Sequence, residues 1–463
     1  MYGLMPKSAD VVVVGSGPGG ASVARALSRA GRRVLVLEQG RDHRGKWYYG
    51  TYPGALCYSE KMALLFTEEG LNIIAPRMVG GATGMYTGSA AMPPEWLAQR
   101  YGIDLKADAE RIAAELGVAP LPADLAGAAS GRIAAAAAAL GQEWFAQPKF
   151  MIPGRCADRG TRFDCGAKCM LGCRCGAKWH AAEWIDEAVF HGTRLATGAR
   201  VAQVLCNGRR VAGVRGWRNG LPFTVWADTV VLSSGGLGSA RIMQHSGMNA
   251  AGVGMAMDTT TMVYGFGPHS GNGLEPPMTY SFENPRDGYM LSTLTDPWLL
   301  YPLAAVRVGP GPLLDWRRWC RGLGIMIKLK DDISGGIYPD GRIRKPMTAA
   351  DRERLDLAAG VCRRILLEAG AGAASIFVRP LIGTHPSATV RIGEMLDENL
   401  MTEIEGLYVC DASVFPESLD RPTVLTILSL GERLSRHLAG QEALGNANPP
   451  SSGGSDAAHG RKP

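Results

Sequence analysis

The sequence has no long hydrophobic segment, no run of basic residues and no evident internal repeat. No stretch of the 463 residues reaches the about 18 apolar residues that mark a membrane-spanning helix, so we expect no transmembrane segment. The net charge of +6 is mild for this length, and no basic stretch alternates with aromatic residues. We therefore expect no nucleic-acid partner.

A secretion signal is also missing from the N-terminal end. Residues Met1 to Asp10 contain one lysine and no apolar core. Ten cysteines in a chain of this kind favour thiols, metal ligands or redox pairs over structural disulfides. We expect a cytoplasmic, globular protein, because 46% of the residues are hydrophobic and 20% are charged.

The clearest pattern lies in the stretch Ala9 to Asp42, which predicts a strand, a glycine turn, a helix and a second strand. Val11 to Val14 is a short β-branched run typical of a buried parallel strand, and Val34 to Leu37 predicts its neighbour. The glycines between them have the spacing G-x-G-x-x-G, and the turn contains Gly15, Gly17, Pro18, Gly19 and Gly20.

Each part of this turn has a physical reason. Gly15 permits the tight turn, Gly17 lets the backbone approach a pyrophosphate, and Gly20 lets the helix pack closely on the strand. The helix N-terminus offers free N–H groups to phosphate oxygens. Glu38 closes the second strand, where a carboxylate binds ribose hydroxyls and disfavours the 2′-phosphate of NADP. The stretch predicts a site for an ADP-containing dinucleotide.

Three later segments also favour ligand binding. The glycine-rich loop Val79 to Pro94 suits backbone contact with a ligand, although a flexible surface loop has the same composition. Asp228 to Gly247 predicts another strand, turn and helix, and Leu407 to Cys410 predicts a strand followed by Asp411. Ligands of open α/β sheets bind at the carboxyl ends of such strands.

Cysteines crowd in the segment RFDCGAKCMLGCRCGAKWH. Clustered thiolates favour an iron–sulfur cluster or zinc, and the candidate ligands are Cys165, Cys169, Cys173 and Cys175. Their spacing is not a standard ferredoxin or zinc-finger spacing, so free thiols with one redox disulfide are an alternative. His180 is a further candidate ligand, but we interpret it as a surface histidine.

The region Met255 to Arg321 is rich in Gly, Pro, Met and aromatic residues, which suits a substrate-facing region.

Taken together, these blocks resemble the glucose–methanol–choline (GMC) family of flavin oxidoreductases. The resemblance spans residues 10 to 440, and five blocks occur in the order of the family. They are GSGPGG with Glu38, the loop after Gly80, Thr197 to Val201, SSGGLGSARIMQHSG from Ser233, and HPSATVRIG followed by CDASVFP. The cysteine-rich segment resembles one found in a subset of the family.

The resemblance implies an α/β fold, with a Rossmann-like FAD-binding domain built from discontinuous segments and a sheet-based substrate domain. We predict FAD-binding segments at residues 6–145 and 181–254, a cysteine-rich insertion at 146–180, and a substrate domain at 255–382. A C-terminal catalytic and FAD-binding segment at 383–440 and a disordered tail at 441–463 complete the chain.

The resemblance also implies the reaction and its residues. The family oxidises an alcohol carbon, with hydride transfer to flavin N5 and His385 as the base. The expected FAD contacts are Gly15, Gly17, Pro18, Gly19, Gly20, Glu38, Gly80, Gly81, Thr83, Val201, Gly235, Asp411, Ala412 and Thr423. No residue resembles the histidine that attaches FAD covalently in some members, so we expect non-covalent FAD.

The sequence departs from the family at one catalytic position. A second His or Asn is usual there, and the matching residue is Pro422, which has no side-chain donor or acceptor. Arg421 is its neighbour and could stabilise developing negative charge.

We expect an FAD-dependent dehydrogenase that acts on an apolar or alicyclic alcohol and passes electrons to a quinone or an electron-transfer protein rather than to O2. The alternatives are C=C reduction or isomerisation, and a redox-sensing flavoprotein without turnover.

Overall fold

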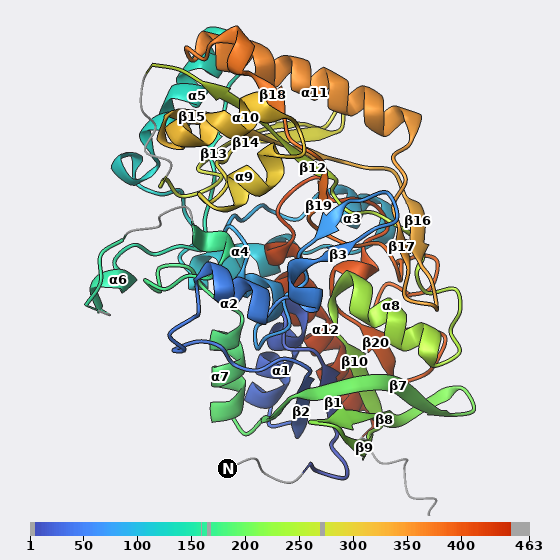
Figure 1. The fold of residues 1–463 in the computed structure, drawn as a ribbon. Helices are drawn as coiled ribbons and strands as arrows, with labels where there is room; N and C mark the ends of the chain where they lie inside the picture. The colour runs from blue at the N-terminus through green and yellow to red at the C-terminus, as the bar shows by residue number, and fades with distance from the viewer. Residues whose placement is uncertain (1–4, 159, 164–167, 269–273, 446–463) are drawn as a thin grey trace, which may run out of the picture.

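The structure is a computed structural model, and it describes residues 5–158, 160–163, 168–268 and 274–445. Two sheets stand one above the other, the lower one built from N-terminal, middle and C-terminal segments of the chain (Figure 1). The predictions for Cys165 and for residues 446–463 fall outside this description.

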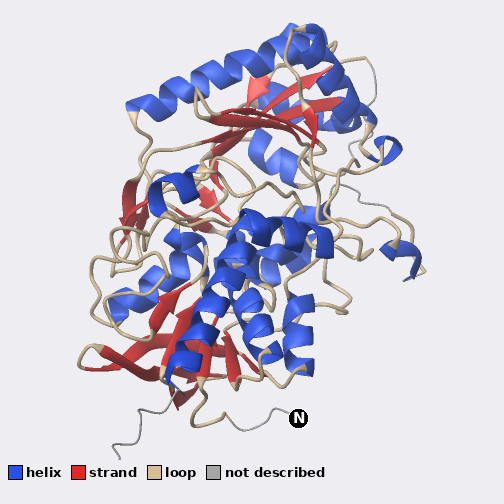
Figure 2. Cartoon of the chain, turned by 180° about the vertical axis from the view of Figure 1, so that it is seen from behind, coloured by secondary structure: helices blue, strands red, loops and turns tan. Residues whose placement is uncertain are grey.

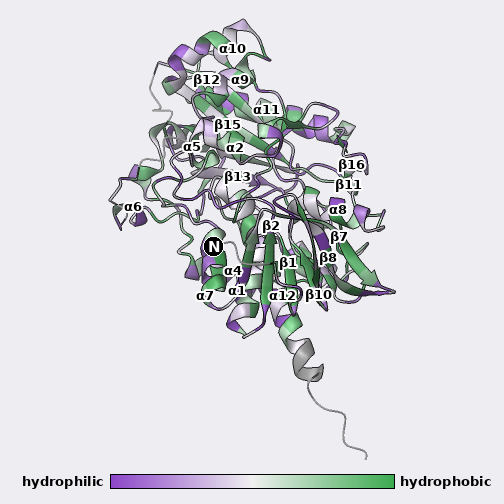
Figure 3. Ribbon diagram, turned by 60° about the horizontal axis from the view of Figure 1, so that its bottom comes forward, coloured by the Kyte–Doolittle hydropathy of each residue, from purple (hydrophilic) through white to green (hydrophobic). Residues whose placement is uncertain are grey.

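The lower sheet is wholly parallel, with the order β20-β10-β1-β2-β6. At its centre, β1 (Val11–Val14) and β2 (Val34–Glu38) are buried along their whole length. Their β-branched and leucine side chains pack on both faces of the sheet, as the uninterrupted apolar runs predict. Figure 3 shows these strands as the hydrophobic centre of the domain. The other strands are β6 (Arg194–Thr197), β10 (Thr229–Leu232) and β20 (Leu407–Val409).

Different layers cover the two faces of the lower sheet. Helices α1 (Pro18–Arg29), α4 (Lys106–Glu115), α7 (Ala182–Phe190) and α12 (Val424–Gly445) pack together and lie in front when the molecule is seen from behind (Figure 2). An antiparallel sheet of β7 (Ala199–Asn207), β8 (Arg210–Arg218) and β9 (Leu221–Trp226) lies in front in Figure 1. This is a Rossmann-like α/β arrangement, as the glycine turn predicts.

The upper sheet is mixed and follows the order β3-β4-β19-β12-β15-β14-β13-β5, with β18 beside β12. At its centre, β12 (Thr260–Phe266) and β15 (Gly322–Leu329) are fully buried. The remaining strands are β3 (Leu65–Phe66), β4 (Asn72–Ile73), β5 (Phe145–Ala146), β13 (Tyr280–Asn284), β14 (Tyr289–Thr293), β18 (Phe377–Val378) and β19 (Ile382–Gly383). The sheet therefore takes short strands from the first 146 residues as well as from 255–383.

Two separate cores cover the faces of the upper sheet. One contains Val263 and Ile325 of the sheet with helices α5 (Ala128–Ala139) and α11 (Ala349–Glu368). The other contains Met262 and Met326 with a helical segment formed by α9 (Leu300–Ala305), α10 (Pro310–Leu314) and η5 (Asp315–Arg321).

Two local sequence patterns, Thr348 with Asp351 three residues on and the dipeptide Asp340-Gly341, predict a helix cap close to a capping box and a hairpin, and the structure contains both. The Thr348 side chain accepts a hydrogen bond from the backbone N–H of Asp351, and the Asp351 carboxylate accepts one from the backbone N–H of Thr348, which completes a capping box at the start of α11. The Asp340-Gly341 turn joins the paired strands β16 (Ser334–Ile337) and β17 (Ile343–Arg344). Helix α12 continues to Gly445, into the tail predicted from residue 441.

The other described elements connect the two sheets or lie at their margins. They are α2 (Tyr52–Cys57), η1 (Glu60–Ala63), η2 (Gly81–Gly84), α3 (Trp96–Tyr101), η3 (Ala123–Leu125), α6 (Arg155–Asp158), η4 (Lys168–Met170), α8 (Gly235–His245), β11 (Val253–Met255), η6 (Ala373–Ser375) and η7 (Ala412–Val414). No helix in the described part of the chain is both long enough and apolar enough to cross a bilayer.

Candidate active site

Strands β1, β10 and β20 end side by side, and we refer to the place beyond their carboxyl ends, where ligands of open α/β sheets bind, as the crevice. A Cβ atom on Gly15 would lie 2.2 Å from the carbonyl oxygen of Ser233, and one on Gly19 would lie 1.9 Å from that of Cys410. These distances are far below van der Waals contact, so the backbone turns after the three strands meet without room for side chains. The glycine turn therefore holds together three segments that are far apart in sequence.

Gly17 differs from the other glycines of this turn. An added Cβ there would have no atom within 4 Å, and Gly17 has an ordinary φ of −65°. The backbone at this point faces open space at the N-terminus of α1, where free N–H groups favour an anion. This arrangement fits the pyrophosphate of FAD.

The second glycine loop packs directly on this turn. The backbone N–H of Gly80 donates to Ser16 Oγ at 3.1 Å, and a Cβ on Gly81 would lie 2.9 Å from the Gly17 Cα. Thr83 holds the loop by donating to the Gly80 carbonyl at 2.6 Å and accepting from the Ala181 N–H at 2.9 Å. The two glycine-rich segments that were predicted to bind FAD therefore pack against each other at the N-terminus of α1.

Glu38 lies at the same place with its carboxylate fixed. One carboxylate oxygen accepts from Ser16 N–H at 3.0 Å and Ser16 Oγ at 2.7 Å, and the other accepts from Gly40 N–H at 2.7 Å. Burial raises the pKa of Glu38, and these donors oppose the increase. The carboxylate is therefore held in one orientation at the edge of the crevice, as a ribose-binding acid must be.

Asp411 joins the ends of β10 and β20. It accepts from Gly235 N–H at 2.8 Å, Ser239 Oγ at 2.6 Å and Ser413 N–H at 2.8 Å. It thereby orients the N-terminus of α8 beside the crevice. Its neighbour Ala412 begins η7.

Two buried hydroxyl groups lie in the C-terminal segments that flank the crevice. Among the described residues, neither Ser413 Oγ nor Thr426 Oγ1 has a hydrogen-bond partner. Buried polar atoms are normally paired, so these atoms fit a bound polar ligand. Thr423 precedes α12 and Val201 lies in β7, and both are buried. Taken together, the two glycine-rich segments, Glu38, Asp411 and these C-terminal residues fit a bound FAD.

His385 lies on a loop that pairs with the chain before β12. Ala256 and Ser387 exchange backbone hydrogen bonds of 3.1 and 2.9 Å, and His385 N–H donates to the Met257 carbonyl at 2.9 Å. A Cβ on Gly236 would lie 1.8 Å from the Pro386 carbonyl oxygen. The His385 loop is therefore fixed between the substrate sheet and the start of α8.

A buried carboxylate orients the imidazole of His385. Asp258 Oδ2 lies 2.7 Å from His385 Nδ1, and the other carboxylate oxygen accepts from the Ser418 hydroxyl. Asp258 is 1% exposed, whereas the His385 side chain is 29% exposed. The Asp258 carboxylate can only accept and requires the proton on Nδ1, whereas the ammonium of Lys328, 3.0 Å from the same nitrogen, can only donate; we take the shorter contact, 2.7 Å to Asp258, as the one that sets the tautomer. Nε2 is then the basic nitrogen, and it has no hydrogen-bond partner within the described part of the chain.

Lys328 completes this group from β15. Its Nζ lies 3.0 Å from His385 Nδ1 and 3.6 Å from Asp258 Oδ2. The antiparallel register places Lys328 opposite Thr260, two residues after Asp258. A lysine and an aspartate, each at most 3% exposed, thus form a buried ion pair against one ring nitrogen of the histidine.

The charges in this group set the protonation states. Burial and the Lys328 charge lower the pKa of His385, with Asp258 opposing them. Burial alone would raise the pKa of Asp258, but Lys328 and His385 overcome it and the pKa lies below its usual value. Burial lowers the pKa of Lys328 despite the attraction of Asp258. His385 is therefore held neutral near pH 7, which suits a base.

The second predicted catalytic residue lies nearby with other partners. The Arg421 guanidinium is 3.1 Å from Asp420 and 3.5 Å from Glu283, and these carboxylates are its ion-pair partners among the described residues. Burial raises the pKa of Asp420 to about 6, with Arg421 opposing and the charge of Asp258 adding to the rise. Arg421 thus neutralises carboxylates in this structure, and its predicted role toward developing charge stays a prediction.

The cysteine-rich segment is described in part. Cys173 Sγ and Cys175 Sγ lie 3.6 Å apart, and the backbone N–H of Lys178 donates to Cys173 Sγ at 3.4 Å. Cys169 is buried in an apolar cluster. No group of three or more His, Cys, Asp or Glu side chains within the described ranges is arranged to hold a metal ion. Cys165 lies outside those ranges, so the cluster stays a prediction.

His180 is not a surface residue, contrary to the interpretation of the sequence. It is 5% exposed, and its ring packs against Gly80 and Gly84. Burial and the charges of Lys178 and Arg44 lower the pKa of His180 to about 3. The imidazole is a neutral packing element beneath the second glycine loop.

Asp258, Lys328 and Ser418 were not predicted from the sequence. Lys328 did leave a local signal, because it is the one charged residue in the otherwise apolar strand GLGIMIKL. A buried lysine requires a partner. Nothing local distinguishes Asp258, whose partners lie 70, 127 and 160 positions away.

Comparisons with known proteins identify one family over most of the matched residues. Two models described as GMC oxidoreductase match residues 95–261 and 342–431, and a model of an NAD(P)-binding Rossmann-like domain matches residues 13–70. Together the first two cover more than half of the chain.

Relatives cover most of the chain at modest identity. An uncharacterized GMC-type oxidoreductase of Mycobacterium tuberculosis is 27% identical over 91% of this chain and 74% of its own length. A long-chain-alcohol oxidase of Arabidopsis thaliana is 25% identical over 91% of this chain and 66% of its own. The crystal structure of pyridoxine 4-oxidase from Mesorbium loti superposes with a TM-score of 0.69 at 18% identity, covering 94% of this chain and 99% of that one.

Proposed function

Because the chain belongs to the GMC oxidoreductase family, we propose that it oxidises the CH–OH group of an apolar or alicyclic alcohol, with His385 as the base. The family assignment makes it an FAD-dependent oxidoreductase. The observation that supports the proposal is the fixed imidazole of His385, with Asp258 on Nδ1 and Nε2 free.

The residues of the chain supply the proton chemistry. Neutral His385 accepts the hydroxyl proton at Nε2, and the ionised Asp258 stabilises the imidazolium that forms. FAD, when bound, supplies the acceptor for the hydride that leaves the carbinol carbon. The glycine turn, Glu38 and the Gly80 loop would hold FAD through its phosphates and ribose.

We propose a quinone or an electron-transfer protein as the final acceptor, in preference to O2. The names of some relatives include oxidases, so the acceptor has to be measured in this protein. Reduced enzyme mixed with a soluble quinone should be reoxidised at least about tenfold faster than in air-saturated buffer. Equal rates in the two conditions would make the enzyme an oxidase.

The test of the proposal is anaerobic flavin reduction. A panel of linear and alicyclic alcohols is mixed with the FAD-loaded protein, and bleaching near ~450 nm is followed by stopped flow. At least one alcohol should reduce the flavin, and His385→Ala should slow that reduction at least ~10²-fold while keeping FAD bound. His245→Ala, on the exposed end of α8, is the matched control. A His385→Ala protein that reduces at the normal rate would contradict the proposal.

A second candidate function is the reduction or isomerisation of a C=C bond. Pro422 favours it, because the position that usually carries a His or Asn has no hydrogen-bonding side chain. In that case added reductant should be required, and no alcohol of the panel should bleach the flavin. Bleaching by an alcohol alone would exclude this reaction as the sole activity.

A further inference from the structure

The segment from Pro297 to Arg321, which contains α9, α10 and η5, covers one face of the substrate sheet. It is apolar both on the side that faces the sheet and on the side that faces solvent. Its inner side is buried in the core with Met262 and Met326, and it contributes Tyr301, Ala305 and Trp319 to that core. Its outer side exposes large apolar side chains, namely Trp298 (47%), Leu303 (67%), Val306 (57%) and Leu314 (61%). A helix that is apolar all round is ordinarily buried on both sides.

Three of the exposed apolar side chains share a face of α9 and its caps. Leu299, Leu303 and Val306 follow the spacing i, i+4, i+7, which places them in one stripe on α9 and its C-cap. Trp298 contacts Trp316 with ring centroids 4.7 Å apart, and Tyr301 donates to the Pro312 carbonyl at 2.9 Å. These contacts tie α9 to α10 and η5, so the segment presents a single defined surface.

The charges of this segment are almost all positive. From Pro297 to Arg321 it carries Arg307, Arg317, Arg318 and Arg321, all exposed, and one acid, Asp315. Asp315 pairs with Arg318 at 2.7 Å, which leaves the net charge of the surface positive. Exposed leucine, valine and tryptophan beside arginines are the composition of surfaces that bind anionic bilayers.

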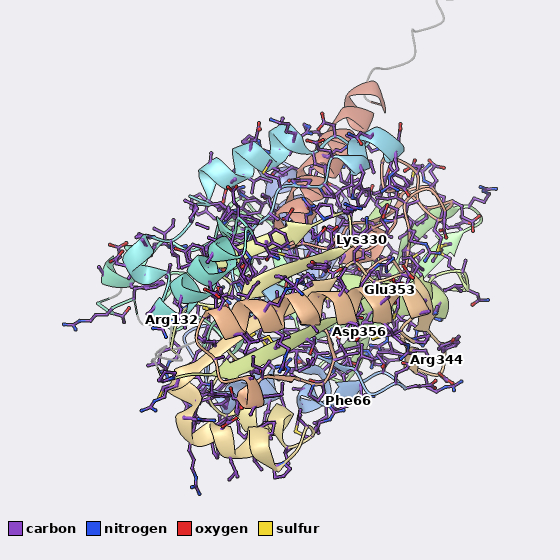
Figure 4. All side chains as sticks on the ribbon, turned by 90° about the horizontal axis from the view of Figure 1, so that it is seen from above. Phe66, Arg132, Lys330, Arg344, Glu353 and Asp356 are labelled. Atoms are coloured by element: carbon purple, nitrogen blue, oxygen red, sulfur yellow. The ribbon has the colours of Figure 1, made fainter. Side chains whose placement is uncertain are left out.

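The opposite side of the same domain has ordinary surface chemistry. Helix α11 carries Glu353 and Asp356 toward solvent, as Figure 4 shows from above. The same view places Phe66, which is 44% exposed, on the side from which α9 and α10 project. Met62 and Leu64, which precede Phe66 in the chain, are 63% and 62% exposed. Exposed apolar side chains thus lie beside arginines on one side of the substrate domain, whereas α11 on the other side also presents acidic side chains to solvent.

We propose that the surface formed by residues 298–321 docks on an anionic lipid bilayer, with Leu303, Val306 and Leu314 in the headgroup region and the arginines against lipid phosphates. The observation that favours a bilayer over a protein partner is the excess of arginines beside the exposed apolar side chains. The proposal does not depend on the oxidation described above.

The test uses the FAD-loaded full chain and two kinds of vesicle, phosphatidylcholine alone and phosphatidylcholine with about 30% phosphatidylglycerol. Cosedimentation should be strong with the anionic vesicles and weak with the neutral ones, and it should fall as salt shortens the Debye length. Leu303→Ser with Val306→Ser should weaken binding at least ~10-fold. Arg317→Gln with Arg321→Gln should weaken it roughly 5-fold per arginine.

Matched controls lie at the other end of the molecule. Leu221→Ser removes an apolar side chain that is 73% exposed on β9, and Arg209→Gln removes an exposed arginine between β7 and β8. Neither should change vesicle binding. Flavin absorbance and the melting temperature of each variant check that it folds.

Three outcomes would overturn the proposal. They are no binding to either vesicle, equal binding to neutral and anionic vesicles, and binding that survives both double substitutions. Concentration-dependent self-association that Leu303→Ser with Val306→Ser abolishes, without vesicle binding, would instead assign the surface to a second copy of the chain.

Discussion

At the scale of single residues, the buried pair of Lys328 and Asp258 decides what His385 can do. A lone buried charge costs several kcal/mol, so removing one partner should destabilise the protein by about 3–5 kcal/mol. Removing both charges together should cost less than the sum of the single changes. We therefore expect Asp258→Asn with Lys328→Met to melt at a higher temperature than Lys328→Met alone. Additive losses in melting temperature would mean that the pair is not coupled.

The same pair predicts the pH profile of flavin reduction. The pKa of His385 is depressed, so the neutral base persists below pH 6.5 and the rate falls only as pH drops through the lower pKa. Lys328→Met removes the positive neighbour and leaves Asp258, which should raise the pKa of His385. The acid limb of the reduction rate should then move to higher pH. Stopped-flow rates between pH 5 and 8 measure this, and an unmoved limb would remove Lys328 from the control of His385.

Asp420 makes the stability of the fold depend on pH. Unlike the pKa of His385, the pKa of Asp420 is raised. Its pKa is raised to about 6 by burial, so protonation favours the folded state. Stability from this group is present below the unfolded pKa near ~4 and is lost as pH rises through about 6. Asp420 has φ +58°, a conformation that asparagine tolerates well.

Asp420→Asn should therefore raise the melting temperature at pH 8 by roughly 1–3 °C and leave it nearly unchanged at pH 4.5. Asp340→Asn, in an exposed pair with Arg342, is the control and should have little effect at either pH. A loss of stability at pH 8 would show that the bond between Asp420 and Arg421 outweighs the burial of the carboxylate.

At the scale of the secondary-structure elements, the sequence predicted what local patterns determine. The valine run of β1, the glycine turn, the cap of α11 and the hairpin at Asp340-Gly341 each depend on neighbours within a few positions. The two-residue strands β3, β4 and β5 were not predicted, because their pairing with distant strands defines them. The burial of His180 was missed for the same reason, since it depends on a loop 100 positions earlier.

The glycines of the turn after β1 should separate folding from cofactor binding. Gly17 faces open space, so Gly17→Val should fold but fill the place of the pyrophosphate and purify without flavin. Gly19→Ala would place a Cβ 1.9 Å from the Cys410 carbonyl and should destabilise the domain itself. Absorbance at ~450 nm and circular dichroism distinguish the two results. A Gly17→Val protein that keeps its flavin absorbance would show that this turn does not contact FAD.

At the scale of the whole molecule, the crevice is the place where separate stretches of the chain depend on one another. Residues 15–20, 80–84, 233–239 and 411–426 come together there, and two buried hydroxyls of the last stretch have no partner among the described residues. Helix α11 packs instead on the far face of the upper sheet, in a core of its own. A ligand in the crevice should therefore stabilise the molecule unevenly.

Removing FAD should therefore lower the hydrogen-exchange protection of backbone amides near the crevice more than that of amides in α11. FAD at about 100 times its Kd contributes about 2.7 kcal/mol to states that open the crevice, which slows their exchange about 100-fold. Peptides covering 80–84 and 411–426 should lose that protection in the flavin-free protein, and peptides of α11 should lose little. Mass spectrometry of the FAD-loaded and flavin-free chain makes the comparison. An equal loss in α11 would mean that both sheets open as one cooperative unit, so that FAD stabilises the substrate domain as strongly as its own.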